Sequence, residues 1–240
     1  MPELRIGTAG WSIPTPLANH FPSDGTSLER YATAFHCAEI NSTFHRSHRL
    51  STYERWAQST PPGFRFSAKL PKTITHAQKL ADCEKLLTAY LEEVEALGER
   101  LAVHLVQLPP SLAFDEKLAT HFFDALRSRT TLNIACEPRH PSWFGSAAED
   151  LFVSRQVARV AADPARVEEA AQSGGWRGLV YYRLHGTPAM YRSSYADGRL
   201  ELYAERLRLA SAQADLWCIF DNTASSAATG DALFLKQLLE

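Results

Sequence analysis

A carboxylate, a guanidinium and an imidazole stand within four residues of one another, at Glu137, Arg139 and His140. The apolar run 132–135 leads into them in the way a buried strand would. Two prolines among and after these residues prevent further ladder hydrogen bonds and favour a turn. A carboxylate that is buried beside cations can transfer protons or hold a polar ligand, so this stretch indicates a functional site.

Other apolar runs of the chain also end in polar or charged residues. These residues are Asn41, Lys69, Gln107, Asp163, Arg183 with His185, and Asp221 with Asn222. Side chains alternate along a strand, so Glu39 shares a face with Asn41, and Arg183 shares one with His185. Buried charges are costly unless they are paired, so we expect these groups to bind one another or a ligand.

Eight apolar runs have the character of strands, and helical patterns alternate with them. The runs are 4–11, 37–41, 64–70, 101–108, 132–137, 157–162, 179–185 and 216–221. Near-continuous apolar strands that alternate with helices predict a parallel sheet buried on both faces. Eight such units in 240 residues predict an α/β fold, with one (β/α)8 TIM-type barrel as a single domain over 1–240. The last two helices are expected at 200–212 and 231–239.

The main alternative is an open doubly wound sheet. Such a sheet usually has fewer strands and a glycine-rich phosphate turn after the first one. Gly7 and Gly10 are too sparse to form that turn. The barrel is therefore favoured, and the carboxyl ends of its strands are where an active site is expected.

The composition narrows the class of protein. The formal net charge of -2 gives no basic excess, so binding to extended nucleic acid is not expected. No apolar run is long enough for a membrane span, and no signal peptide is recognised, so a cytoplasmic protein is expected. The four cysteines are scattered without metal-binding spacing, which indicates buried reduced thiols. No metal or cofactor is predicted, and no oligomeric state follows.

The leading hypothesis is an enzyme that uses acid–base chemistry on a small anionic substrate, phosphorylated or carboxylated and sugar-like. Glu137 is expected to act as the general base or acid, and His185 as a second proton-transfer group. Lys69 completes the predicted catalytic set, and with Arg139 and Arg183 it would hold the anionic group.

Further residues are expected to bind the substrate. Asn41 and Gln107 would orient its hydroxyl groups. The remaining members of the predicted binding set are Glu39, Asp163, Asn222 and Trp11. Asp163 precedes a proline and is equally open to a turn role. Trp11 and Tyr191 could form an aromatic rim, but packing explains such residues more often.

Ion pairing is the alternative to catalysis for the charged residues. Glu39 could serve only as a partner for Lys69 or Arg183. Glu137 and Arg139 are two residues apart, a spacing that is not ideal for a pair on one strand. That spacing favours a functional role for Glu137.

Two other functions remain open. The first is a metal-dependent hydrolase or isomerase with Glu137, Asp163 and His185 as ligands, which would suit Mg, Mn or Zn. Positive charge from the basic residues at the same mouth disfavours an added dication. The second is a non-catalytic module that binds a phosphate group or a nucleic-acid end.

Several motifs at these strand ends occur together in one family. They lie at 7–11, 39–44, 66–71, 107–110, 137–144 and 183–186. On these motifs the chain resembles the YecE-like family, also called domain of unknown function family 72, over essentially its whole length. The resemblance implies a TIM-type barrel and brings no activity with it. Two departures concern His45, where the family pattern often has Tyr, and Asp221-Asn222, which replaces a frequent Asn-Asn pair.

Overall fold

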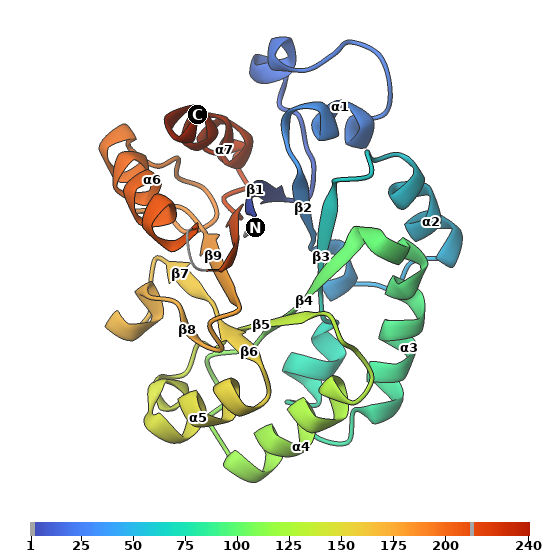
Figure 1. Cartoon of the computed structure of the whole chain (residues 1–240), viewed down its shortest axis with the longest axis vertical. Helices are drawn as coiled ribbons and strands as arrows, with labels where there is room; N and C mark the ends of the chain where they lie inside the picture. Colours follow the sequence, from blue (N-terminus) through green and yellow to red (C-terminus); the bar gives the residue numbers. More distant parts are fainter. Residues whose placement is uncertain (1–2, 212–213) are drawn as a thin grey trace.

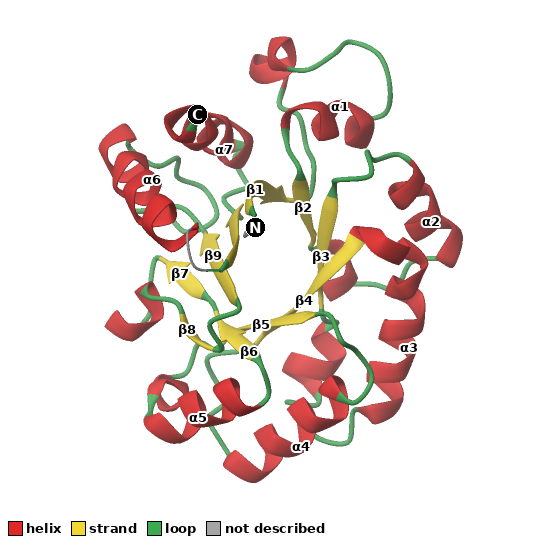
Figure 2. Cartoon of the chain, viewed as in Figure 1, coloured by secondary structure: helices red, strands yellow, loops and turns green. Residues whose placement is uncertain are grey.

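The computed structural model describes residues 3–211 and 214–240. Within these residues, the strands are β1 (Leu4–Ala9), β2 (Cys37–Ile40), β3 (Arg65–Lys69), β4 (Leu101–Gln107), β5 (Asn133–Glu137), β6 (Val157–Arg159), β7 (Ala161–Asp163), β8 (Gly174–Gly175), β9 (Leu179–Leu184) and β10 (Asp215–Phe220). They form one sheet in the order β7-β9-β10-β1-β2-β3-β4-β5-β6-β8. Figures 1 and 2 show the strands as a ring with the helices outside it. The predicted TIM-type barrel is confirmed.

The ring closes through the segment that the sequence predicts as one strand, 157–162. Val160 interrupts it, so β6 pairs with β5 while β7 pairs with β9. The backbone N–H of Val160 still donates to the carbonyl of Cys136 at 2.8 Å. The short strand β8 lies antiparallel to β6. The interrupted segment 157–163 therefore joins the two sides of the ring, and the sheet is parallel except for β8.

The helices of the described residues are α1 (Ser27–Ala34), α2 (Leu50–Gln58), α3 (Glu84–Val94), α4 (Glu116–Arg127), α5 (Ser146–Ser154), α6 (Asp197–Ser211) and α7 (Ala227–Leu239). The predicted end of the sixth helix, Ala212, lies outside the described residues. The last helix begins four residues earlier than predicted. Between β7 and β9 a short 3-10 turn, Glu168–Ala171, stands in place of an α-helix, and β8 follows it. None of the described helices has the length and apolar character needed to cross a bilayer.

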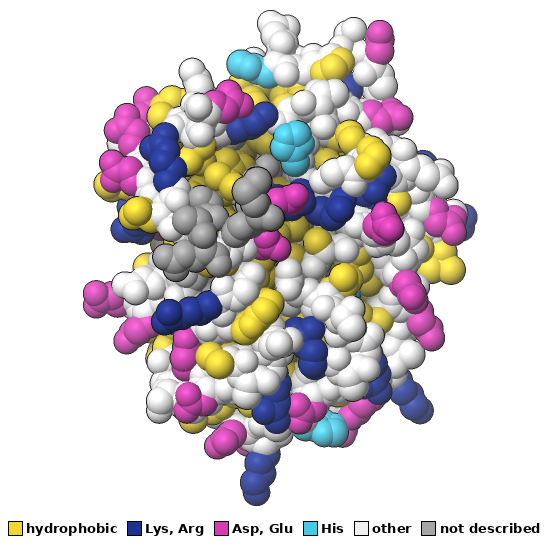
Figure 3. All heavy atoms as spheres, in the orientation of Figure 1, with side chains coloured by type: hydrophobic (Ala, Val, Ile, Leu, Met, Phe, Trp, Pro, Cys, Tyr) yellow, Lys and Arg dark blue, Asp and Glu magenta, His cyan; other side chains and the backbone are white. Residues whose placement is uncertain are grey.

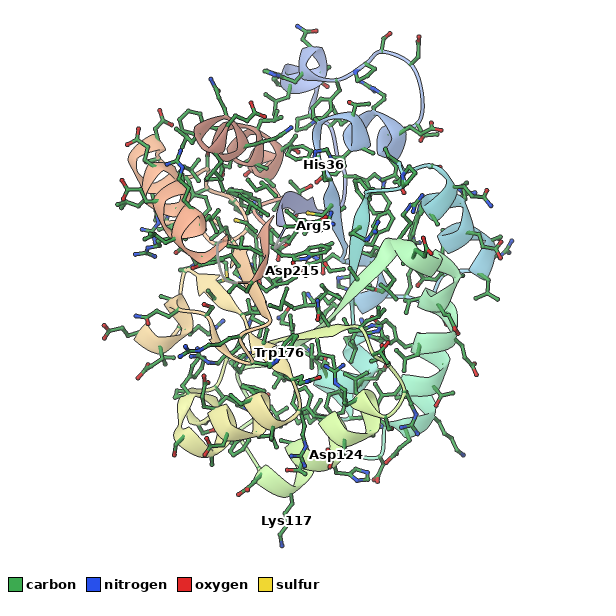
Figure 4. All side chains as sticks on the ribbon, viewed as in Figure 1. Arg5, His36, Lys117, Asp124, Trp176 and Asp215 are labelled. Atoms are coloured by element: carbon green, nitrogen blue, oxygen red, sulfur yellow. The ribbon has the colours of Figure 1, made fainter. Side chains whose placement is uncertain are left out.

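Apolar side chains fill the barrel interior from its amino end to its middle. Val103 and Leu105 of β4 meet Tyr181 of β9 and Trp217 of β10 in an inner cluster. Trp176, labelled in Figure 4, packs against this cluster. A second, larger cluster lies between the strands and the helices. Alternation along the strands then places charged side chains in the last inward layer, at the carboxyl ends.

Candidate active site

Arg183 of β9 lies at the centre of this charged layer and is fully buried. Its Nε and Nη2 donate to the two oxygens of Glu39 at 3.0 and 2.7 Å. Its Nη1 donates to Glu137 at 2.5 Å, and Nη2 donates also to Asp221 at 2.8 Å. Of the two ion-pair partners considered for Glu39, Lys69 and Arg183, the structure pairs it with Arg183. Three carboxylates, from the ends of β2, β5 and β10, surround one guanidinium.

His185 follows β9 and extends this arrangement. Its Nδ1 lies 3.1 Å from Asp221 Oδ2, and its Nε2 lies 3.3 Å from Glu137 Oε1. Burial alone would lower the pKa of His185, but the Glu137 carboxylate and the hydrogen bonds to both carboxylates outweigh burial and raise it. A doubly protonated ring satisfies both contacts, so the geometry favours imidazolium.

Arg139 also joins Glu137, contrary to the expectation from sequence spacing. Its Nε donates to Glu137 Oε1 at 2.9 Å. The pair forms because β5 ends at Glu137, so Arg139 stands in a turn and is not bound by strand alternation. We call Arg183, Glu39, Glu137, Asp221, His185 and Arg139 the buried network.

The cations keep the carboxylates of this network ionised. Burial works to raise the pKa of Glu137, but Arg183 first, then Arg139 and His185, hold it well below its ordinary range. The pKa of Asp221 is lowered in the same way, since Arg183 and His185 outweigh its burial. Neither carboxyl group can donate a proton near neutral pH. Glu137 is also a poor proton acceptor, because its negative charge is so strongly stabilised.

Tyr191 covers the network from the loop between β9 and α6. Its hydroxyl accepts a hydrogen bond from Arg139 Nη2 at 3.0 Å, and its ring centroid lies 5.3 Å from that of His185. Only about 10 Å³ of free space remains beside Glu137, in a cavity that Met190 also lines. From the sequence Tyr191 is expected only as a rim or packing residue, because a contact across 52 residues leaves no local signal.

Lys69 differs from the other cations of the mouth. Its side chain is nearly buried, and Nζ lies 4.2 Å from the centroid of the Phe44 ring. Within the described part of the chain its ammonium makes no hydrogen bond or ion pair. Burial, followed by repulsion from Arg183, lowers the pKa of Lys69 to about 8. Lys69 is therefore a largely desolvated amine whose charge contacts the Phe44 ring and has no hydrogen-bond or ion-pair partner among the described residues.

Two amides near the network also have unused hydrogen-bonding capacity. Asn41 Nδ2 donates weakly to Asp221 at 3.4 Å, while its buried Oδ1 has no partner. The side chain of Gln107, at the end of β4, is nearly buried and makes no hydrogen bond to the described residues. Both amides could bind hydroxyl groups of a ligand, as the sequence suggests.

Asp163 does not join the buried network. Its carboxylate accepts hydrogen bonds from Arg199 at 2.9 and 2.8 Å and from Tyr203 at 2.7 Å, both on α6. Among the described residues, no group of three or more His, Cys, Asp or Glu is placed to hold a metal. The trio of the metal hypothesis, with Glu137 and His185, is therefore not assembled.

Asn222 and Trp11 also lie in other surroundings. Asn222 Nδ2 donates to Asp231 at 2.6 Å and to the carbonyl of Ser193 at 2.9 Å, which fixes the loop over the mouth to α7. Trp11 packs edge-on against Trp56, with ring centroids 5.0 Å apart. These contacts give both residues a positioning or packing role.

Larger cavities lie outside the network. One of about 270 Å³ adjoins the mouth, and its wall includes Phe44, His45 and Lys72. Phe44 thus contacts both this cavity and the Lys69 amine. Another, of about 530 Å³, is lined by His104 and Arg127 near the amino ends of β4 and β5. It is remote from the charged layer and carries no comparable set of groups.

Comparison with known proteins places the chain among relatives of one kind. Two curated proteins, each named UPF0759 protein YecE, come from Escherichia coli K12 and Escherichia coli O157:H7. Each is 35% identical over 153 residues, which is 63% of this chain and 54% of the relative. The match thus spans about half the length of these relatives.

Solved structures share the fold. A DUF72 family protein from Enterococcus faecalis V583 has a TM-score of 0.81 at 21% identity, with 100% of this chain and 98% of that chain covered. One from Thermotoga maritima MSB8 has a TM-score of 0.78 at 22% identity, with 98% of each chain covered. A xylose isomerase-like TIM barrel/4-hydroxyphenylpyruvate dioxygenase fusion protein has a TM-score of 0.53 at 14% identity, with 99% of this chain and 42% of that chain covered.

These structural likenesses concern the fold alone. The sequence itself matches the family described as "Protein of unknown function DUF72" over residues 5–240. That match includes every strand-end motif on which the resemblance rests, and the resemblance is confirmed: the chain belongs to the DUF72 family.

Proposed function

We propose that the chain is an enzyme that performs acid–base chemistry on a small, anionic, hydroxyl-bearing molecule at the carboxyl mouth of the barrel. One observation carries the proposal: the nearly buried Lys69 side chain makes no hydrogen bond or ion pair with the described residues, while each nearby carboxylate is already paired. Burying a cation without a partner is costly. An anionic ligand group on Lys69 would remove that cost.

The charge balance supports an anionic ligand. The three carboxylates of the buried network are matched by its two guanidiniums and the protonated His185. The Lys69 ammonium adds one further positive charge to this balanced set, although the carboxylates lie near enough to attract it. A phosphate or carboxylate group suits this position. The unused amide groups of Asn41 and Gln107 suit hydroxyls beside it, which together describe a sugar-like acid or phosphate.

The same geometry favours particular chemical roles. With a pKa of about 8, Lys69 exchanges its proton readily near neutral pH and suits proton transfer. His185 carries a proton that it could donate after the Tyr191 loop moves aside. Glu137 is better suited to holding Arg139 and His185 in place than to the general-base role expected from the sequence.

Ligand-dependent thermal stabilisation tests the proposal. Inorganic phosphate, sugar phosphates and aldonic acids are added separately to wild type, Lys69→Gln and Lys117→Gln. Lys117 is exposed on α4, away from the mouth, and controls for loss of a surface charge. We expect at least one ligand to raise the Tm of wild type and of Lys117→Gln but not of Lys69→Gln. Equal stabilisation of all three proteins would reject the proposed site.

A non-catalytic binding module is the second candidate. The observation in its favour is that both nitrogens of His185 are already committed and little space remains beside Glu137. Figure 3 shows basic and acidic side chains interspersed on the face at the amino ends of the strands, so no basic track crosses that face, and the formal net charge of -2 gives no basic excess for extended nucleic acid.

Turnover separates the two candidates. NMR spectra of a bound ligand over hours would reveal conversion by an enzyme, and Glu137→Gln should slow conversion, because Glu137 holds Arg139 and His185 in place. The module would be favoured if the affinity for a 5′-phosphorylated oligonucleotide rises steeply as the salt concentration falls and no ligand is ever converted.

A further inference from the structure

We infer that the Lys69 amine forms a Schiff base with the carbonyl carbon of the substrate, which places that substrate among small aldehydes or ketones bearing an anionic group. The inference rests on the proposed function, because it uses the same mouth and the same ligand charge. It goes further by naming the reacting atom of the protein and the reacting group of the substrate.

The backbone of Lys69 is firmly held. Lys69 pairs with Leu105 in the sheet, and the next residue, Leu70, donates from its N–H to the Leu105 carbonyl at 2.9 Å. The Lys69 carbonyl accepts a hydrogen bond from Thr43 Oγ1 at 2.6 Å. The amine is therefore presented to the mouth from a fixed base, as covalent catalysis requires.

The amine itself is free to react. A lysine bound to a carboxylate would first have to break that pair, but the carboxylates of the buried network are occupied by Arg183 and its neighbours. The Phe44 ring lies 4.2 Å from Nζ and shields one side of the amine from water. Shielding also protects an imine from hydrolysis.

Nucleophilic attack needs the neutral amine. Burial and the Arg183 charge lower the pKa of Lys69 to about 8, so about a tenth of the amine is neutral at pH 7. By roughly the same relation, the neutral form makes up well below 0.1% of an exposed lysine at that pH. Desolvation beside another cation is one of the known ways in which a lysine is made nucleophilic.

A proton acceptor lies beside the same aromatic ring. The imidazole centroid of His76 is 4.9 Å from that of Phe44. Burial, then the charges of Lys69 and Arg139, lower the pKa of His76, so its ring is neutral near pH 7. His76 can therefore accept the proton that the amine loses during the reaction.

The step is a condensation without oxidation or reduction. The lone pair of Nζ attacks the carbonyl carbon, a C–N bond forms, and the carbonyl oxygen takes a proton to give a carbinolamine. The nitrogen loses a proton, the hydroxyl is protonated, and the C–O bond breaks to release water. One amine and one carbonyl thus give one imine and one water. Gln107, whose amide N–H groups are unused, is suited to donate to the carbonyl oxygen.

Reductive trapping tests the inference. Wild-type protein is incubated with glyoxylate, pyruvate or dihydroxyacetone phosphate and sodium cyanoborohydride, then digested and mapped by mass spectrometry. We expect one adduct per chain, on Lys69, with a trapping rate that rises with pH around a midpoint near 8. Lys69→Arg should lose the adduct, and the control Lys72→Arg should keep it. Mapping the wild type locates the adduct even where a variant folds poorly.

Two outcomes would overturn the inference. One is labelling spread over the exposed lysines 72, 79, 85 and 117 with none on Lys69, and the other is no adduct with any of the three carbonyl compounds. If anions still stabilise wild type but not Lys69→Gln, the proposed function stands and only the Schiff base is rejected. If Lys69→Gln also leaves anion binding unchanged, both the proposed function and the Schiff base are rejected.

Discussion

Glu39 and Arg183 form a two-pronged ion pair, with hydrogen bonds of 3.0 and 2.7 Å, inside a barrel where both side chains are 0% exposed. Glu39 is also bound by Tyr181, whose hydroxyl donates to Oε2 at 3.0 Å. The pair thus links the apolar interior of the barrel to the charged mouth above it. Its burial makes it sensitive to the loss of either partner.

Glu39→Gln should lower the free energy of unfolding by about 3–5 kcal/mol, because Arg183 would lose a charged partner where water cannot replace it. Urea denaturation measures this change. Asp124→Asn is the control: Asp124 pairs with Arg155 at 2.7 Å on the exposed surface, and its loss should cost less than about 1 kcal/mol. Equal costs for the two variants would contradict the buried pairing.

Lys69→Met should stabilise the protein at neutral pH. The pKa of Lys69 falls from 10.5 to about 8 on folding, so below pH 8 the folded state bears the cost of a buried charge, on the order of 3 kcal/mol. That cost is relieved as pH rises from 8 to 10.5. The stability advantage of Lys69→Met over wild type should therefore shrink over this range in urea denaturation. An advantage independent of pH, or none, would show that the amine is solvated.

His185→Gln should make the free energy of unfolding vary less with pH between pH 6 and pH 9. Because the pKa of folded His185 lies above 6.5, its charged form stabilises the protein fully below pH 6.5, and this contribution is lost as pH rises through the folded value. The lowered pKa values of Glu137 and Asp221 act in the opposite direction, so their contribution is lost only in acid. The difference in unfolding free energy between wild type and variant should be greatest near pH 5–6 and smaller at pH 9. A difference that grows with pH would contradict the assigned imidazolium.

Asp221→Asn should tighten anion binding at the mouth, on the order of tenfold, since it removes one negative charge near Lys69 and leaves the two guanidiniums of the buried network in place. Calorimetric titration with the anion identified by thermal stabilisation measures the effect. Asp124→Asn makes the same charge change far away on α4 and should leave affinity unchanged. Weaker binding to Asp221→Asn would place the anion elsewhere.

Strand periodicity explains which parts of the site could be predicted. Alternation along β2 and β9 is a local property, and it correctly places Glu39 and Arg183 on inward faces at the same end. The eight predicted strand segments rest on the same kind of local sequence pattern. The pairing of Glu39 with Arg183 needs only those two facts and the cost of a buried charge.

The remaining features depend on contacts that local patterns do not encode. The interruption at Val160 arises where one strand segment closes the ring between β5 and β9, and residues 157–162 contain no glycine or proline that would mark a break. Asp163 lies just after this break and meets Arg199 of α6, which is 36 residues further along. The Arg139–Tyr191 contact likewise depends on how a long loop folds back over the mouth.

A crystal structure of the protein soaked with ribose 5-phosphate, or with a tighter anion from the stabilisation panel, tests the central claim most directly. We expect the anionic group within hydrogen-bond distance of Lys69 Nζ, with the Glu39–Arg183 pair undisturbed beneath it. An anion bound at the outer surface, with Lys69 still unpartnered against Phe44, would contradict it.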